Sequence, residues 1–272
     1  MRFKKLMLER MYDLIRFHLY SMISHYFENQ VYTVRCGLLK GLKRKGGLGF
    51  IPIMKMTEEE KFLANLKLEG QTVFDVGAFT GLFTMFFARA VGKNGKVIAF
   101  EPNPSLCFRI KENLLLNKFD NVKIMQLALG REKKKEVLAF PSMIPGVGSI
   151  EEHEKARILK QRSARTIEVD VDTIDNLIAA EKVPAPDFIK IDVQGAELDV
   201  LIGASNTIKR CKPKLLIEVH SIPYINWKNK NLQRIVDFLT EKGYSLYHVE
   251  SEKKINSDTI HTIKADEHLY CF

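Results

Sequence analysis

From residue 72 onward, short apolar segments of strand length alternate with segments of helical periodicity. Such an order lets each helix carry the chain back, so that successive strands pair in parallel and both faces of the sheet are covered. The pattern predicts strands at Thr72–Val76, Lys96–Phe100, Val122–Leu127, Thr166–Val171, Phe188–Val193, Lys214–Val219, Tyr244–Val249 and His268–Phe272. It predicts helices at Gly81–Ala90, Pro104–Lys118, from Asp172, at Ala196–Ile202 and at Leu232–Thr240. The expected fold class is therefore α/β.

One internal segment departs from this alternation. Residues Arg131–Arg165 are polar and irregular, and we expect no regular structure there. The stretch Pro141–Ser149 within them is rich in Gly, Pro and Ser, a composition typical of a lid or a substrate loop.

The first 57 residues form a basic extension. The chain carries a net charge of +9, and residues 1–57 hold 11 Lys/Arg against 3 Asp/Glu, so the remainder is almost neutral. A uniformly basic nucleic-acid binder is therefore disfavoured. We divide the chain into this extension (1–57) and a larger domain (58–272). The larger domain begins with a capping box, Thr57 with Glu60, which starts a helix ending near Gly70.

Within the extension, apolar residues recur at helical spacing over Met7–Tyr26, and a short strand is expected at Val31–Arg35. The apolar stripe of this helix can pack on the larger domain or on a second subunit. Because basic residues flank it, the helix can alternatively lie on an anionic membrane surface. No apolar run is long enough for a transmembrane helix, and the four cysteines lack metal-ligand or disulfide spacing. We expect a cytoplasmic protein, with peripheral membrane contact as the alternative.

A glycine loop and an acidic residue follow the first two strands of the larger domain. The first strand runs into Asp75-Val76-Gly77-Ala78-Phe79-Thr80-Gly81, and the second ends at Glu101. Glycines let the backbone approach a ligand closely, and a carboxylate at that position can accept both hydroxyls of a ribose. The loop lacks the G-x-G-x-x-G spacing of dinucleotide sites and the lysine of a P-loop. The negative charge of Asp75 suits a ligand that carries an amine and a sulfonium, which is S-adenosylmethionine.

Several segments together resemble the FkbM family of S-adenosylmethionine-dependent methyltransferases. They are Val73–Ala78, Phe100–Pro104, Phe188–Glu197 and Glu218–His220, and the resemblance runs from about Gly70 to about Gly243. It implies a class I methyltransferase, Rossmann-like fold with a seven-stranded sheet whose last strand is antiparallel. The sequence departs from the family at Phe79, where Asn is usual, and at Gln194, where Glu is usual.

The resemblance also implies which residues hold the cofactor. Asp75, Gly77, Ala78 and Gly81 would face its methionine portion, and Glu101 would bind the ribose hydroxyls. Pro102 and Asn103 would lie beside the adenine, with Ala128 as a further adenine contact and Asp192 on the same rim.

Methyl transfer to a hydroxyl requires alignment of the reacting atoms and removal of a proton. Five polar residues at or just after strand ends are candidates for this work: Lys190, Asp192, Glu197, Glu218 and His220. His220 is the first choice as base, because its unperturbed pKa lies nearest to neutral pH, although a histidine at a strand end can equally be a hydrogen-bonded structural residue. Glu218 could orient it or bind the acceptor. Glu197 could have no catalytic role and simply complement the dipole at the start of its helix. Lys190 could likewise do no more than form an ion pair with Asp192. Asp192, Glu218 and His220 could bind a divalent metal by ligand type, but their spacing does not demand one, and we expect none.

The function expected from these features is O-methylation of a small molecule or glycan. Lys43-Arg44-Lys45 suggests an RNA methyltransferase as the alternative, but the larger domain is nearly neutral and no RNA-binding module is recognisable, so we expect no nucleic-acid partner. A non-catalytic module that binds an adenosyl ligand is a third reading. The polar residues at the strand ends favour an enzyme.

Overall fold

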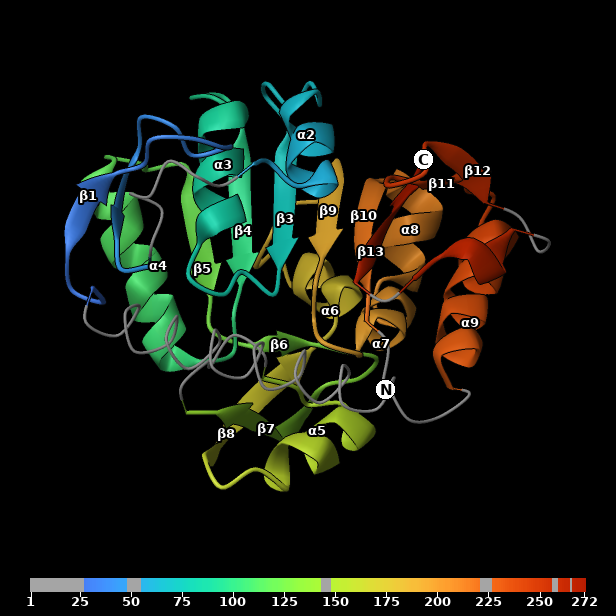
Figure 1. The fold of residues 1–272 in the computed structure, drawn as a ribbon. Helices are drawn as coiled ribbons and strands as arrows, with labels where there is room; N and C mark the ends of the chain where they lie inside the picture. The colour runs from blue at the N-terminus through green and yellow to red at the C-terminus, as the bar shows by residue number, and fades with distance from the viewer. Residues whose placement is uncertain (1–26, 48–54, 143–147, 221–226, 256–258, 265) are drawn as a thin grey trace, which may run out of the picture. The chain divides into compact units, whose positions relative to one another are not determined.

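The computed structural model describes residues 27–47, 55–142, 148–220, 227–255, 259–264 and 266–272 (Figure 1). The chain divides into two compact units, Met1–Lys55 and Met56–Phe272. In the first unit, β1 (Val31–Thr33) pairs antiparallel with β2 (Lys43–Lys45). The sequence predicted β1, but β2 was missed because its three basic residues carry no apolar alternation. The predicted helix Met7–Tyr26 lies outside the described residues.

The second unit is built on an eight-stranded sheet with the order β12-β11-β13-β10-β9-β3-β4-β5. Its parallel strands are β3 (Thr72–Val76), β4 (Lys96–Phe100), β5 (Val122–Met125), β9 (Phe188–Ile191) and β10 (Lys214–Val219). The remaining strands are β11 (Leu246–His248), β12 (Lys253–Ile255) and β13 (Glu267–Cys271). Strand β13 lies antiparallel between β10 and β11. The seven-stranded methyltransferase sheet is thus present, with β12 as an additional edge strand that the sequence pattern did not predict.

Helices cover both faces of this sheet. They are α2 (Glu58–Ala64), α3 (Leu82–Ala90), α4 (Pro104–Leu116), α6 (Ile174–Ala179), α7 (Glu197–Ile202), α8 (Ser205–Cys211) and α9 (Trp227–Glu241), followed by the short 3-10 helix η2 (Ile260–Thr262). On one face, Phe74 of β3 belongs to the same core cluster as Leu201 of α7 and Leu239 of α9. On the other face, the ring of Phe188 in β9 lies 5.9 Å from that of Phe87 in α3. Among the described residues, no helix is long and apolar enough to cross a membrane.

A small second sheet lies beyond the carboxyl ends of the central strands (Figure 1). It has the order β6-β8-β7, with β6 at Ala128–Leu129, β7 at Lys134–Pro141 and β8 at Ala164–Asp172, and helix α5 (Glu152–Leu159) packs against it. The prediction that Arg131–Arg165 is irregular was therefore wrong. Strand β7 keeps much of its length exposed, with Lys135 paired to Glu168 of β8, so its sequence shows little apolar alternation. Residues 143–147 of the predicted loop lie outside the described residues.

Three helices differ from the sequence pattern. The capping box of Thr57 and Glu60 is confirmed, but α2 ends at Ala64 rather than near Gly70. Helix α8 was not predicted. It begins only two residues after the end of α7, so the sequence shows no clear boundary between two separate helices there. The helix predicted at Leu232–Thr240 begins earlier, at Trp227.

Candidate active site

The glycine loop after β3 is shaped by the neighbouring strand. Gly77 has φ +85°, and a Cβ there would lie 1.8 Å from the backbone carbonyl oxygen of Asp192. Phe79 also adopts a left-handed conformation, with φ +52°. Asn tolerates this region better than bulky residues do, which gives a backbone reason for the family's usual Asn at that position. The loop therefore brings the ends of β3 and β9 into close contact.

Glu101 is fixed at the end of β4 by backbone groups. Its Oε2 accepts a hydrogen bond from the backbone N–H of Phe79 at 2.9 Å, and its Oε1 accepts one from the N–H of Asn103 at 2.9 Å. Burial raises the pKa of Glu101 to about 7, although both hydrogen bonds favour the charged form. Each carboxylate oxygen keeps lone-pair capacity for a further donor, as a ribose diol requires.

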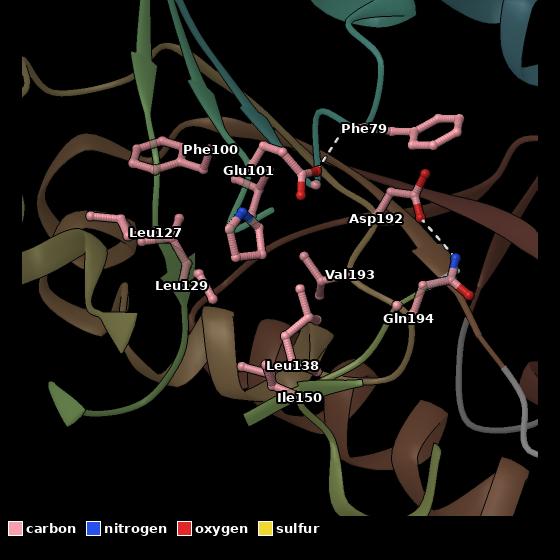
Figure 2. A pocket seen from close by; sticks show the side chains of 16 residues that line it. Phe79, Phe100, Glu101, Leu127, Leu129, Leu138, Ile150, Asp192, Val193 and Gln194 are labelled. Atoms are coloured by element: carbon pink, nitrogen blue, oxygen red, sulfur yellow. Dashed lines mark hydrogen bonds between the residues drawn. The ribbon is translucent and has the colours of Figure 1, made fainter. Parts of the chain in front are cut away.

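A pocket with a cavity volume of about 120 Å³ opens beside Glu101 (Figure 2). Figure 2 shows apolar side chains from several elements around it. Its lining residues are Val76, Gly77, Phe79, Phe100, Glu101, Pro102, Leu127, Ala128, Leu129, Leu138, Gly148, Ile150, Asp192, Val193, Gln194 and Ala196. The apolar walls suit a flat base, and Glu101 supplies the acceptors for a sugar diol, so the residues fit an adenosyl group.

Several of the predicted cofactor residues lie in this lining, and the others support it. Gly77, Glu101, Pro102, Ala128 and Asp192 line the pocket. The remaining four, Asp75, Ala78, Gly81 and Asn103, lie outside the lining.

Each of those four has a place in the loop or the helices beside it. Asp75 is buried and accepts a hydrogen bond from the hydroxyl of Thr84 at 2.5 Å, and burial raises its pKa. Asn103 caps α4, Gly81 precedes α3 with φ +83°, and Ala78 is buried. Their roles toward the cofactor stay predictions.

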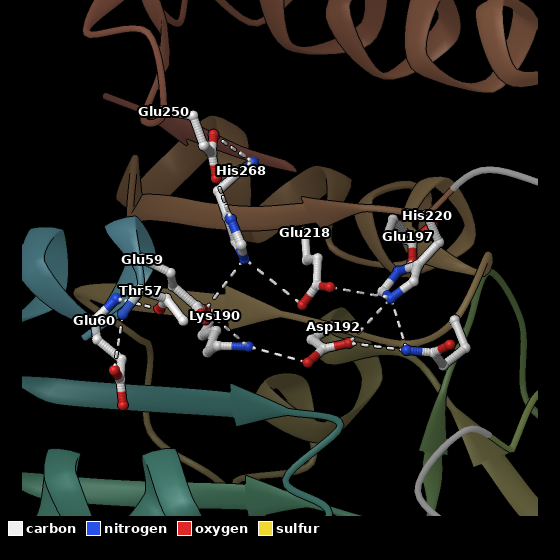
Figure 3. Close-up of polar contacts among 11 residues, drawn as sticks. Thr57, Glu59, Glu60, Lys190, Asp192, Glu197, Glu218, His220, Glu250 and His268 are labelled. Atoms are coloured by element: carbon white, nitrogen blue, oxygen red, sulfur yellow. Dashed lines mark hydrogen bonds and ion pairs between the residues drawn. The ribbon is translucent and has the colours of Figure 1, made fainter. Parts of the chain in front are cut away.

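Next to the pocket, Lys190 is buried among carboxylates at the centre of the sheet (Figure 3). Its Nζ lies 3.2 Å from Oδ2 of Asp192 and 3.4 Å from Oε1 of Glu59. Burial opposes the ammonium charge, but these carboxylates outweigh it and raise the pKa of Lys190. Burial likewise opposes ionisation of Asp192, but the charges of Lys190 and His220 outweigh it and lower its pKa. Lys190 is therefore a fixed positive charge that keeps Asp192 ionised.

His220 is held by a buried carboxylate. Its Nδ1 lies 2.8 Å from Oε1 of Glu197, which is 0% exposed. On the other side of the ring, Nε2 lies 3.5 Å from Glu218 and 3.6 Å from Asp192. Burial disfavours the imidazolium, but the hydrogen bond to Glu197 and the neighbouring carboxylates outweigh it and raise the pKa of His220 to about 9. The side-chain amide of Gln194 also contacts Nε2, at 2.6 Å.

The structure thus brings together all five residues predicted for the chemistry. Figure 3 shows Lys190, Asp192, Glu197, Glu218 and His220 in one connected polar cluster. Strand alternation is confirmed as the reason for two of the contacts, Lys190 with Asp192 and Glu218 with His220. Their catalytic roles stay predictions.

Sequence reasoning missed the residues that extend this cluster. Nε2 of His268 lies 3.4 Å from Glu59 and 3.6 Å from Glu218, and its Nδ1 lies 2.6 Å from Glu250. Burial opposes the imidazolium charge of His268, but these carboxylates raise its pKa to about 10. The available signal was the antiparallel last strand, because its register places His268 opposite Glu218.

Two sets of side chains in the cluster have the chemistry of metal ligands. The ligand atoms of Asp192, Glu218 and His220 lie within 4.8 Å of one another, as do those of Glu59, Glu218 and His268. Lys190 already supplies positive charge between the two sets. Lys190 therefore offsets part of the carboxylate charge there, and the expectation that no metal binds stays a prediction.

Comparisons with known proteins identify the family of this chain. The model of a family described as "Methyltransferase FkbM domain" matches residues 75–246. The chain is 27% identical over 143 residues to Methyltransferase 1 of Beauveria bassiana, covering 48% of this chain and 57% of that protein. It is 28% identical over 154 residues to the hexuronic acid methyltransferase AglP of Haloferax volcanii, covering 56% of this chain and 57% of that protein. The chain therefore spans little more than half the length of these relatives.

A solved structure shares the fold. The methyltransferase FkbM from Methylobacillus flagellatus KT superimposes with a TM-score of 0.51 at 18% identity, covering 77% of this chain and 45% of that one.

Proposed function

Because the chain belongs to the FkbM family of S-adenosylmethionine-dependent methyltransferases, we propose that it transfers a methyl group from S-adenosylmethionine to a hydroxyl of a sugar, a glycan or another small molecule. The observation that carries the proposal is the adjacency of two features. The pocket beside Glu101 shares Asp192 and Gln194 with the cluster that holds the candidate base, His220.

The cofactor supplies an electrophilic methyl group on a positively charged sulfur. Glu101 would accept hydrogen bonds from its ribose hydroxyls, and the apolar walls at Leu129, Leu138 and Ile150 would exclude water from its base. These contacts orient the cofactor without taking part in bond making.

The acceptor hydroxyl must lose a proton while its oxygen bonds to the methyl carbon and the carbon–sulfur bond breaks. His220 would receive this proton at Nε2, while Glu197 holds the ring through Nδ1 and stabilises the imidazolium that forms. With a pKa of about 9, His220 is mostly protonated at neutral pH, so the competent base is the minor form there. The products are the methyl ether, S-adenosylhomocysteine and a proton.

The relative from Haloferax volcanii, which is named a hexuronic acid methyltransferase, supports a sugar as the class of acceptor. Isothermal titration with S-adenosylmethionine and with NAD tests the cofactor site, and a transfer assay that measures S-adenosylhomocysteine across a panel of glycosides tests the reaction. Binding of NAD in place of S-adenosylmethionine would overturn the proposal.

A further inference from the structure

We propose that the acceptor is an uncharged, hydroxyl-rich ring, and that the carboxylates of Asp192 and Glu218 select it against acceptors that carry their own carboxylate. This inference rests on the proposed function and adds the charge class of the substrate. It comes from the charges that a bound acceptor would meet beside His220.

The cations of the cluster are more deeply buried than the carboxylates near His220. The side chains of Asp192 and Glu218 are 23% and 19% exposed, whereas that of Lys190 is 2% exposed and that of His268 is 9% exposed. Carboxylates also outnumber cations in the cluster even when all of its imidazoles are protonated. The carboxylates are Glu59, Asp192, Glu197, Glu218, Glu250 and Glu267, and the cations are Lys190, His220, His248 and His268. An anionic acceptor would therefore approach a surface of its own charge.

The accessible carboxylates can also accept hydrogen bonds from a bound ligand. An ionised carboxylate only accepts hydrogen bonds, and Lys190 keeps Asp192 ionised. Sugar hydroxyls donate to such groups, whereas the carboxylate of a hexuronic acid offers no donor and adds repulsion. The hydrogen-bonding chemistry and the charge thus select the same class of ligand.

An apolar side chain lies near these carboxylates, in the lining of the pocket beside Glu101. Phe79 is 37% exposed and lines the pocket together with Asp192 and Gln194 (Figure 2). Aromatic rings pack on apolar surfaces, and a pyranose ring presents C–H groups on its faces and hydroxyls around its edge. Phe79 beside carboxylates therefore matches both surfaces of a neutral sugar.

The test compares matched pairs of methyl hexosides and methyl hexuronides of gluco, manno and galacto configuration, which differ only at C6. We expect kcat/KM for transfer to at least one hexoside to exceed that for its hexuronide by about tenfold or more, since like-charge contacts are strongly unfavourable in such sites. Titration of the same pairs into enzyme loaded with S-adenosylhomocysteine gives the binding preference independently of turnover.

Two variants test whether Glu218 causes the preference for hexosides over hexuronides. Glu218→Gln should narrow the hexoside-to-hexuronide ratio in the binding titration, whatever its effect on turnover. Glu168→Gln is the matched control, because it removes an exposed carboxylate of β8 that pairs with Lys135, and the ratio should stay unchanged. If Glu218→Gln does not fold, Asp192→Asn serves the same purpose.

Equal or greater use of the hexuronides, or no transfer to any hexoside by enzyme that binds S-adenosylmethionine, would overturn this inference and leave the proposed function in place. Failure to bind S-adenosylmethionine would overturn the proposed function itself.

Discussion

Nδ1 of His220, at the end of β10, lies 2.8 Å from Oε1 of Glu197, the first residue of α7. Glu197 is completely buried, and its Oε1 also accepts the backbone N–H of Gly195 at 2.9 Å. A carboxylate fixed in this way holds the imidazole in one orientation and favours its protonated form. It therefore raises the pH at which the ring of His220 loses its proton.

If His220 is the base, kcat/KM should rise with pH and level off above about 9, where the imidazole loses its proton. His220→Ala should lower turnover by about 10²–10⁴ while the affinity for S-adenosylmethionine stays unchanged. Glu197→Gln should move the rising limb to lower pH, because the charge that stabilises the imidazolium is gone. A pH–rate profile of each variant measures this. An unshifted profile in a folded Glu197→Gln protein would assign the proton transfer to another group.

Glu101 should make cofactor affinity depend on pH. Its carboxylate is charged only above its pKa of about 7, so the affinity for S-adenosylmethionine should increase as pH rises through that value. Glu101→Ala should weaken binding by roughly 1.5–3 kcal/mol, the usual range for hydrogen bonds to a charged group. Titration calorimetry from about pH 6 to pH 8 tests both statements. Glu101→Gln provides the control, because its binding should lose the pH dependence.

Gly77→Ala should destabilise the fold strongly. The new Cβ would meet the carbonyl oxygen of Asp192 at 1.8 Å, in a backbone conformation with φ +85°. Overpacking and left-handed backbone strain together should lower the free energy of unfolding by about 3 kcal/mol or more. Gly70→Ala separates the two effects, because Gly70 has φ +74° and a Cβ there would have nothing within 4 Å. This variant should lower the free energy of unfolding by only about 1–2 kcal/mol. Similar urea-unfolding free energies for the two variants would contradict the close approach.

His268 should make stability fall at alkaline pH. The folded-state pKa of His268, about 10, lies above the usual value of 6.5. The stability that the imidazolium contributes is therefore fully present below about pH 6.5 and is lost as pH rises through about 10. The difference in unfolding free energy between the wild type and His268→Gln should therefore shrink across this interval. Urea titrations at several pH values measure it. A constant difference would mean that His268 stabilises the protein through packing alone.

The sequence predicted those features of the site that depend on local pattern. Strand β10 has the predicted bounds, Lys214–Val219, and period-two alternation placed Glu218 and His220 on one face. The glycine loop and Glu101 were identifiable because their spacing along the chain reflects the βαβ connection. These features need no knowledge of contacts between distant segments.

The remainder of the site depends on such contacts. Glu59 reaches Lys190 only because α2 packs near β9, and His268 reaches Glu218 only through the register of β13 on β10. Apolar periodicity contains no register between strands that are far apart in sequence. Half-exposed elements such as β7 were missed for a different reason, since their Lys and Glu residues conceal the apolar face.

The position of β13 has a consequence for synthesis of the protein. Residues 267–271 fill the gap between β10 and β11, so the edges of both strands stay unpaired until those residues leave the ribosome. Parallel strands β3, β4 and β9 can pair earlier, during translation. The half of the sheet that carries His220 would therefore form last, after the nucleoside pocket. During that delay the unpaired strand edges are exposed, and a chaperone would be needed most there.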